Sequence, residues 1–170
     1  MTWTDAAALT HVAAATSGLL LGAVVLVSPK GTTGHRVIGG VYAGILLLVN
    51  AAALGLHRDA TFGVFHWLSV VSLVTLVVGL LPLLLGHRSR VVLTTHAYCM
   101  TWSYAGLVAA GSGQLAAARG PDSPATVPVT IGVVLLVCAL AIAWRVPPAV
   151  QAVEAVRRGH DVLRVDRPPR

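Results

Sequence analysis

The sequence predicts an all-α integral membrane protein, a bundle of five transmembrane helices built as a four-helix core plus one. Three observations support this fold class. Of the 170 residues 56% are hydrophobic, only 11% are charged, and the mean hydropathy is +0.80. A soluble domain carries about a quarter charged residues. The expected partner is therefore the lipid bilayer, and nucleic acid is not expected, because the basic residues lie at the ends of apolar runs.

Five apolar runs predict the helices, with polar segments between them. They cover residues 6–27, 37–56, 62–85, 91–118 and 129–144. The first run lacks the basic start and the A-x-A site of a signal peptide, so we expect it to remain in the membrane. Pro82 is expected to kink the end of the third run.

The fourth run has the most polar middle, with Thr101, Ser103 and Tyr104. We expect it to face the bundle interior, where polar side chains find partners. The transmembrane domain is expected to span residues 1–146. Residues 147–170 predict a basic cytoplasmic tail with a short amphipathic patch and a disorder-prone end.

The distribution of basic residues predicts the orientation. If the N-terminus lies outside, ten of the 12 Lys and Arg residues fall in inside segments and two fall outside. The inside residues are Lys30, Arg36, Arg88, Arg90, Arg145, Arg157, Arg158, Arg164, Arg167 and Arg170, and the outside residues are Arg58 and Arg119. This bias predicts an N-out, C-in orientation.

Histidines are the strongest functional candidates among the side chains, because ionisable groups in a membrane are costly. Four of the seven fall into two layers, His11 with His66 near the outer end and His35 with His96 near the inner end. In an up-down bundle alternate helices are diagonal neighbours, so each layer aims two imidazoles across the core. Paired imidazoles on facing helices are the ligand set of a haem b site.

Two further readings of these residues stay open. Six glycines in the first, second and fourth runs could leave room for a macrocycle, or could serve ordinary close helix packing. They are Gly18, Gly22, Gly39, Gly40, Gly44 and Gly106. A zinc or copper ion bound by His35, His96 and Met100 is the alternative cofactor, because imidazole suits both metals and thioether suits Cu(I). The four histidines could also be structural, each satisfied by a hydrogen bond.

Lys30 and Arg36 lie in the polar turn before the second run, and Tyr42 follows. These three residues are a candidate site for lipid headgroups, with plain positive-inside anchoring as the alternative. Cys99 and Cys138 lie inside apolar runs without a C-x-x-C spacing and are expected to be small apolar residues. A hydrolytic zinc enzyme is disfavoured, because no apolar run contains an acidic general base.

Several of these elements together resemble a known family. They are Gly31, the HR pair at His35 and Arg36, Gly39 and Tyr42; the segment FHWLS at residues 65–69; and His96 and Met100 with Tyr104 and Gly106. The chain resembles domain-of-unknown-function family 2306 (DUF2306), predicted multi-pass bacterial membrane proteins, over roughly residues 1–120. The resemblance implies a compact multi-pass protein with recurring intramembrane histidines, and it carries no established activity.

The leading functional hypothesis is a multi-pass protein of the bacterial plasma (inner) membrane with a histidine-based intramembrane cofactor site, which holds haem b or a transition metal. Such a protein would work in electron transfer or in cofactor handling, with a respiratory membrane protein as a possible partner. The alternative is a non-catalytic scaffold, transport or assembly protein whose histidines are structural.

Overall fold

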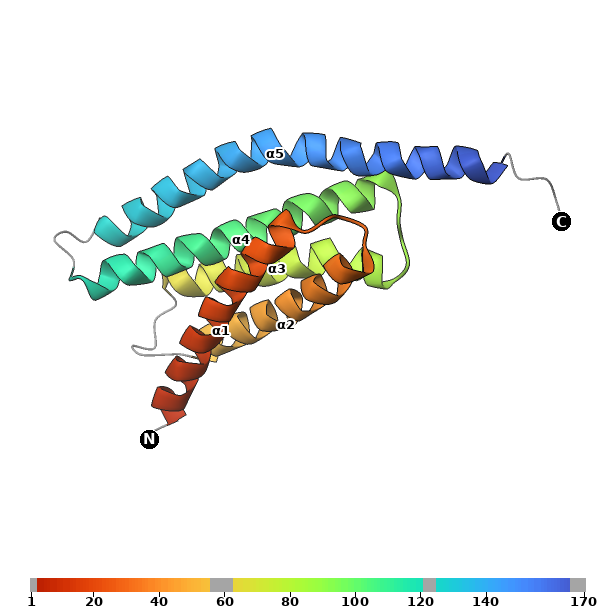
Figure 1. Cartoon of the computed structure of the whole chain (residues 1–170). Helices are drawn as coiled ribbons and strands as arrows, with labels where there is room; N and C mark the ends of the chain where they lie inside the picture. Colours follow the sequence, from red (N-terminus) through yellow and green to blue (C-terminus); the bar gives the residue numbers. More distant parts are fainter. Residues whose placement is uncertain (1–2, 56–62, 121–124, 166–170) are drawn as a thin grey trace.

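The computed structural model describes residues 3–55, 63–120 and 125–165, with side chains for 5–55, 63, 65–120 and 125–155. Five helices follow one another (Figure 1): α1 (Trp3–Val27), α2 (Thr33–Gly55), α3 (Val64–Leu84), α4 (Arg90–Ala118) and α5 (Thr126–Val165). Within those ranges every regular element is a helix, as the five apolar runs predict. The all-α fold class is confirmed.

The first four helices form a ring (Figure 1). α1 packs along α2 and α3 packs along α4, while contacts between α2 and α3 and between α1 and α4 close the ring. α5 packs against the outside of α4. Helices α2 and α4 are therefore diagonal neighbours, as are α1 and α3, which is the order expected for an up-down bundle.

Four helices are long and apolar enough to cross a membrane: α1, α2, α3 and α5. The described chain is therefore that of a membrane-embedded helical protein. α4 is long enough, with 29 residues, but it does not reach the same apolarity. It lies between α1, α3 and α5, and its central polar residues Thr101, Ser103 and Tyr104 are buried or half-buried against these helices. Whether α4 makes a fifth span, and the N-out, C-in orientation, remain predictions.

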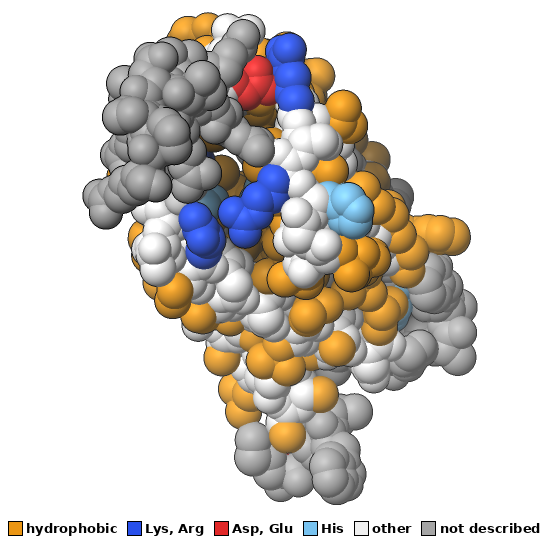
Figure 2. Space-filling view, turned by 90° about the vertical axis from the view of Figure 1, so that its right-hand side faces the viewer, with side chains coloured by type: hydrophobic (Ala, Val, Ile, Leu, Met, Phe, Trp, Pro, Cys, Tyr) orange, Lys and Arg blue, Asp and Glu red, His pale blue; other side chains and the backbone are white. Residues whose placement is uncertain are grey.

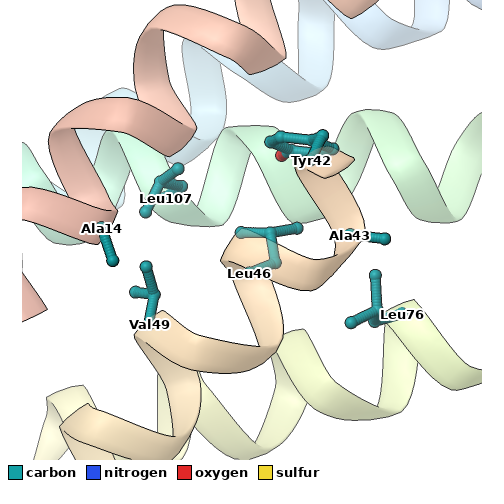
Figure 3. Close-up of a cluster of buried hydrophobic side chains, with 7 residues drawn as sticks. All are labelled: Ala14, Tyr42, Ala43, Leu46, Val49, Leu76 and Leu107. Carbon is teal, nitrogen blue, oxygen red and sulfur yellow. The ribbon is translucent and has the colours of Figure 1, made fainter. Parts of the chain in front are cut away.

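The core lies where the four helices of the ring meet (Figure 3). Its buried members are Ala14, Tyr42, Ala43, Leu46, Val49, Leu76 and Leu107. Large apolar side chains on the outer faces remain exposed, among them Leu20 on α1 and Trp144 on α5. Apolar outer surfaces suit a lipid environment. The helices suit it too, because each satisfies most of its backbone hydrogen bonds internally.

Two glycines of α1 allow the close approach of its neighbours. A Cβ atom on Gly22 would lie 2.5 Å from the ring of Tyr104 and 2.8 Å from that of Tyr42. A Cβ atom on Gly18 would lie 3.1 Å from Leu107. Side chains therefore fill the space beside both glycines, which is ordinary close helix packing and leaves no room there for a macrocycle.

Polar side chains link α2, α3 and α4 inside the ring. The Asn50 side-chain amide donates to the Ser72 hydroxyl at 3.0 Å, and the Thr75 and Ser103 hydroxyls are 2.9 Å apart. Ser103 is 2% exposed, so the expectation that the polar middle of α4 faces the interior is confirmed. Such bonds join helices that the hydrophobic effect alone does not hold together in lipid.

α5 is longer than the predicted run of residues 129–144. It continues through Pro147 and Pro148 to Val165, and it bends along its length (Figure 1). Each proline lacks the N–H that would bond one turn back, which weakens the helix there without ending it. Beyond the prolines α5 stays on α4 through the ion pair of Glu154 with Arg90, at 2.9 Å.

Candidate functional site at the inner end of the bundle

The turn between α1 and α2 is built from local caps. Gly31 has a φ of 81°, a left-handed conformation that glycine adopts without strain. The Lys30 amine donates to the carbonyl oxygens of Val25 and Leu26 at 2.7 and 2.8 Å, so it satisfies carbonyls left free at the end of α1. Partial burial lowers the pKa of Lys30 below its ordinary value.

The same turn positions His35 in the first turn of α2. The Thr32 hydroxyl accepts a hydrogen bond from the His35 backbone N–H at 3.1 Å, as an N-cap side chain does. Arg36 donates to the carbonyl of Gly31 at 3.3 Å. Lys30 and Arg36 are thus both engaged with nearby backbone, at the end of the molecule where basic and histidine side chains gather (Figure 2).

His35 and His96 come together across the diagonal of the ring. They lie close enough for their charges to interact, and Lys30 lies within the same range of His35. Both imidazoles are half-buried. The Nδ1 atom of His35 is buried and makes no hydrogen bond within the part of the chain that the structure describes. The pairing of the inner layer as ligands of one group stays a prediction.

The backbone of α3 sets the tautomer of His96. Its Nδ1 atom lies 2.9 Å from the carbonyl oxygen of Gly79. A carbonyl only accepts, so Nδ1 carries the hydrogen and the lone pair of the neutral ring is on Nε2. A histidine whose Nδ1–H is held by a backbone carbonyl is the usual form of a metal-ligating imidazole.

Met100 lies one helical turn beyond His96 and packs against the same glycine. Its sulfur would be 3.5 Å from a Cβ atom on Gly79, and the Cβ of Cys99 would be only 2.7 Å away. Gly79 therefore lets α3 approach α4 closely enough for its carbonyl to reach His96. Nothing in the spacing of the sequence singles out this glycine, because its partners lie on another helix.

The outer layer is arranged differently. The Nδ1 atom of His11 lies 3.1 Å from the carbonyl oxygen of Val49, which leaves its Nε2 lone pair available. The Nδ1 atom of His66 instead accepts from the backbone N–H of Gly63 at 3.2 Å, so it caps its own helix. A neutral His66 bonded in this way carries its hydrogen on Nε2 and presents no second lone pair to a metal.

Tyr42 lies apart from the two basic residues with which it was grouped. It is 1% exposed and belongs to the core between α1, α2 and α4. Its hydroxyl is buried and makes no hydrogen bond to any described residue. The nearby Tyr104 hydroxyl donates to the carbonyl of Leu19 at 3.3 Å. The structure thus places Tyr42 beside Tyr104 in the interior and not at the headgroup surface.

The available donors limit the kind of metal site that can form. Among the described residues there is no group of three or more His, Cys, Asp and Glu side chains suited to one metal ion. A site at the inner end would therefore rest on the two imidazoles, with the Met100 thioether as the further donor.

Comparison with models of protein families assigns the chain to a family. The sequence model of a family described as "Predicted membrane protein (DUF2306)" matches residues 8–146. The chain belongs to this family. No curated protein and no solved structure matches it significantly. The resemblance to DUF2306 is thus confirmed, and the match extends beyond residues 1–120, from α1 into α5, where it ends at Val146. In this DUF2306 protein the inner histidines and Tyr42 all fall within the matched residues.

Proposed function

We propose that this DUF2306 protein binds a transition metal ion at the inner end of the bundle, with His35 and His96 as ligands and Met100 as a further donor. The bound metal would serve electron transfer, or would be held for delivery to a respiratory protein of the bacterial inner membrane. The observation that carries the proposal is the bond from His96 Nδ1 to the Gly79 carbonyl, which leaves the Nε2 lone pair available to a metal, with His35 within electrostatic range.

Among the metals, copper in its Cu(I) state suits these donors best. Thioether and imidazole are ligands that Cu(I) accepts, and soft donors favour it over hard cations. Structural zinc sites are almost always four-coordinate, which would require a donor beyond the two imidazoles and the methionine. The described His, Cys, Asp and Glu side chains form no group of three suited to one ion, which also suits an ion that accepts few ligands.

Haem b is the second candidate, because His35 and His96 lie on diagonal helices, as two axial ligands would. Side chains of α2 and α4 occupy the space beside Gly18 and Gly22, whereas nothing described lies within 4 Å of a Cβ atom on Gly39, Gly40, Gly44 or Gly106. The donor set, and not the packing, is therefore the reason for placing a single ion first. A non-catalytic scaffold with structural histidines is the reading that remains if neither cofactor is bound.

Metal analysis and an absorption spectrum of the detergent-purified protein test these alternatives together. We expect about one copper per chain after reconstitution with Cu(I), and loss of most of it in His35→Ala and in His96→Ala. His87→Ala, an exposed histidine in the α3–α4 turn, is the matched control. A Soret band would support haem b instead. Full metal content in both inner variants would overturn the site.

A further inference from the structure

A lysine acts on the two inner histidines from the turn between α1 and α2. Lys30 lies within electrostatic range of both His35 and His96, and the two histidines lie within range of each other. His35 opens α2 and His96 belongs to α4, so the three side chains reach this end of the bundle from different parts of the chain. The basic and histidine side chains at this end are visible in Figure 2.

Hydrogen bonds hold the Lys30 amine in place. It donates to the carbonyl oxygens of Val25 and Leu26 at 2.7 and 2.8 Å. Both carbonyls belong to the last turn of α1, where the helix dipole carries a partial negative charge that favours a cation. The charge of Lys30 is therefore a fixed part of the surroundings of His35 and His96, although the side chain is partly exposed and water screens it.

No described carboxylate offsets this charge. The acidic residues with described side chains are Asp5 and Glu154. Asp5 lies in the first turn of α1, at the opposite end of that helix from Lys30, and Glu154 is paired with Arg90 at 2.9 Å. Neither is among the charges that act on His35 or His96. An ion bound between the histidines would thus experience the positive charge of Lys30 without a nearby negative partner from the described side chains.

The charge of the bound ion decides how strongly Lys30 opposes it. The Coulomb energy of two charges is proportional to their product, so a divalent ion is repelled twice as strongly as a monovalent ion at the same position. A fixed positive charge therefore shifts the preference of a site toward the ion of lower charge. This effect is separate from the softness of the Met100 thioether, which favours Cu(I) through the bond that it forms.

We propose that Lys30 makes the inner site selective for monovalent over divalent transition metal ions. This inference rests on the proposed metal site of His35, His96 and Met100, and it gives Lys30 the part of the selectivity that the donor atoms do not supply. Lys30 is not itself a ligand, because its amine is engaged with the two carbonyls of α1.

The test compares two ions of different charge, neither of which changes its oxidation state. The affinities of Ag(I), which stands in for Cu(I), and of Zn(II) are measured by competition titration in the purified full-length wild type and in Lys30→Gln. Both affinities should rise in the variant, and the factor for Zn(II) should be the square of the factor for Ag(I). A threefold gain for Ag(I) would thus accompany about a ninefold gain for Zn(II). Lys30→Arg keeps the charge and should keep the wild-type ratio of the two affinities.

Arg36→Gln is the matched control, because it removes the same charge from the same turn. The Arg36 guanidinium bonds to the Gly31 carbonyl and is not among the charges that act on either histidine, so the ratio should not change. A local distortion at Lys30 would change both affinities by a similar factor and would not produce the squared relation.

Equal factors for the two ions in Lys30→Gln, or a shift of the same size in Arg36→Gln, would overturn the role of Lys30 and leave the metal site standing. A wild-type protein that binds neither ion would overturn the metal site itself, and the role of Lys30 with it.

Discussion

The Nδ1 atom of His96 on α4 lies 2.9 Å from the carbonyl oxygen of Gly79 on α3. This bond is possible because α3 carries no side chain at that position, and a Cβ atom there would lie 2.7 Å from the Cβ of Cys99. One residue thus sets both the separation of the two helices and the tautomer of a candidate ligand. A methyl group added at Gly79 is therefore expected to disturb the inner site although Gly79 is not a metal ligand.

Gly79→Ala should therefore destabilise the protein and weaken metal binding at the same time. Overpacking of this kind costs about 1–3 kcal/mol, measured as the free energy of unfolding in detergent. Gly44→Ala should be neutral or slightly stabilising, because nothing described lies within 4 Å of its added methyl group and alanine favours the helix. Equal stability and metal content in both variants would contradict the role of Gly79.

His35 and His96 should behave as one unit in metal binding. If each contributes only when the other is present, the double variant His35→Ala with His96→Ala loses about as much metal as either single variant. His11→Ala should retain the inner metal, since its Nδ1 serves the carbonyl of Val49 near the other end of α2. Metal losses that simply add in the double variant would argue against a shared ion.

Thr75→Val should loosen the contact between α3 and α4. It keeps the shape of the side chain and removes the 2.9 Å hydrogen bond to Ser103. We expect a loss of about 0.5–2 kcal/mol in the free energy of unfolding, the range for a buried hydrogen bond between helices in lipid. Thr16→Val is the control, because the exposed Thr16 bonds only to the carbonyl of Val12 in its own helix. An equal effect of the two changes would refute the interhelical role.

The ion pair of Arg90 with Glu154 should hold the second half of α5 against α4. Arg90 is exposed, with a side chain at 74%, whereas that of Glu154 is at 11%. We expect Arg90→Ala to change overall stability by less than about 1 kcal/mol, but to speed amide hydrogen exchange in α5 beyond Pro148. Arg145→Ala, whose described contact is with the Trp144 ring, should leave that exchange unchanged.

The distribution of basic residues predicts the orientation of the protein in its membrane. A reporter fused after Arg170 should be active only on the cytoplasmic side, and one placed in the connection between α4 and α5 only on the outer side. Ten of the 12 basic residues fall on the inside in this arrangement. Activity of the C-terminal reporter on the outer face would show that the bundle is inverted.

The local composition of the sequence was enough to predict the helices of this protein and the inward face of the fourth one. Five apolar runs predicted five helices, and the polar middle of the fourth run predicted that Ser103 is buried. The similar depth of His35 and His96 also followed from helical rise, and the two imidazoles lie within electrostatic range of each other, whereas their role as ligands stays a prediction. The apolar run of residues 129–144 is shorter than α5, which continues through Pro147 and Pro148 to Val165. Composition marks only the apolar part of this helix, whereas packing on α4 and the Glu154 ion pair hold its polar continuation.

Only the tertiary structure decided which groups these residues meet. Tyr42 resembled a headgroup anchor in the sequence, yet the approach of α1 at Gly22 encloses it in the core. His66 resembled a ligand, yet its Nδ1 caps its own helix. The partner of His96 is a backbone carbonyl, and every residue has one. Residue types alone could not identify it, because helix separation and rotation determine which carbonyl an imidazole reaches.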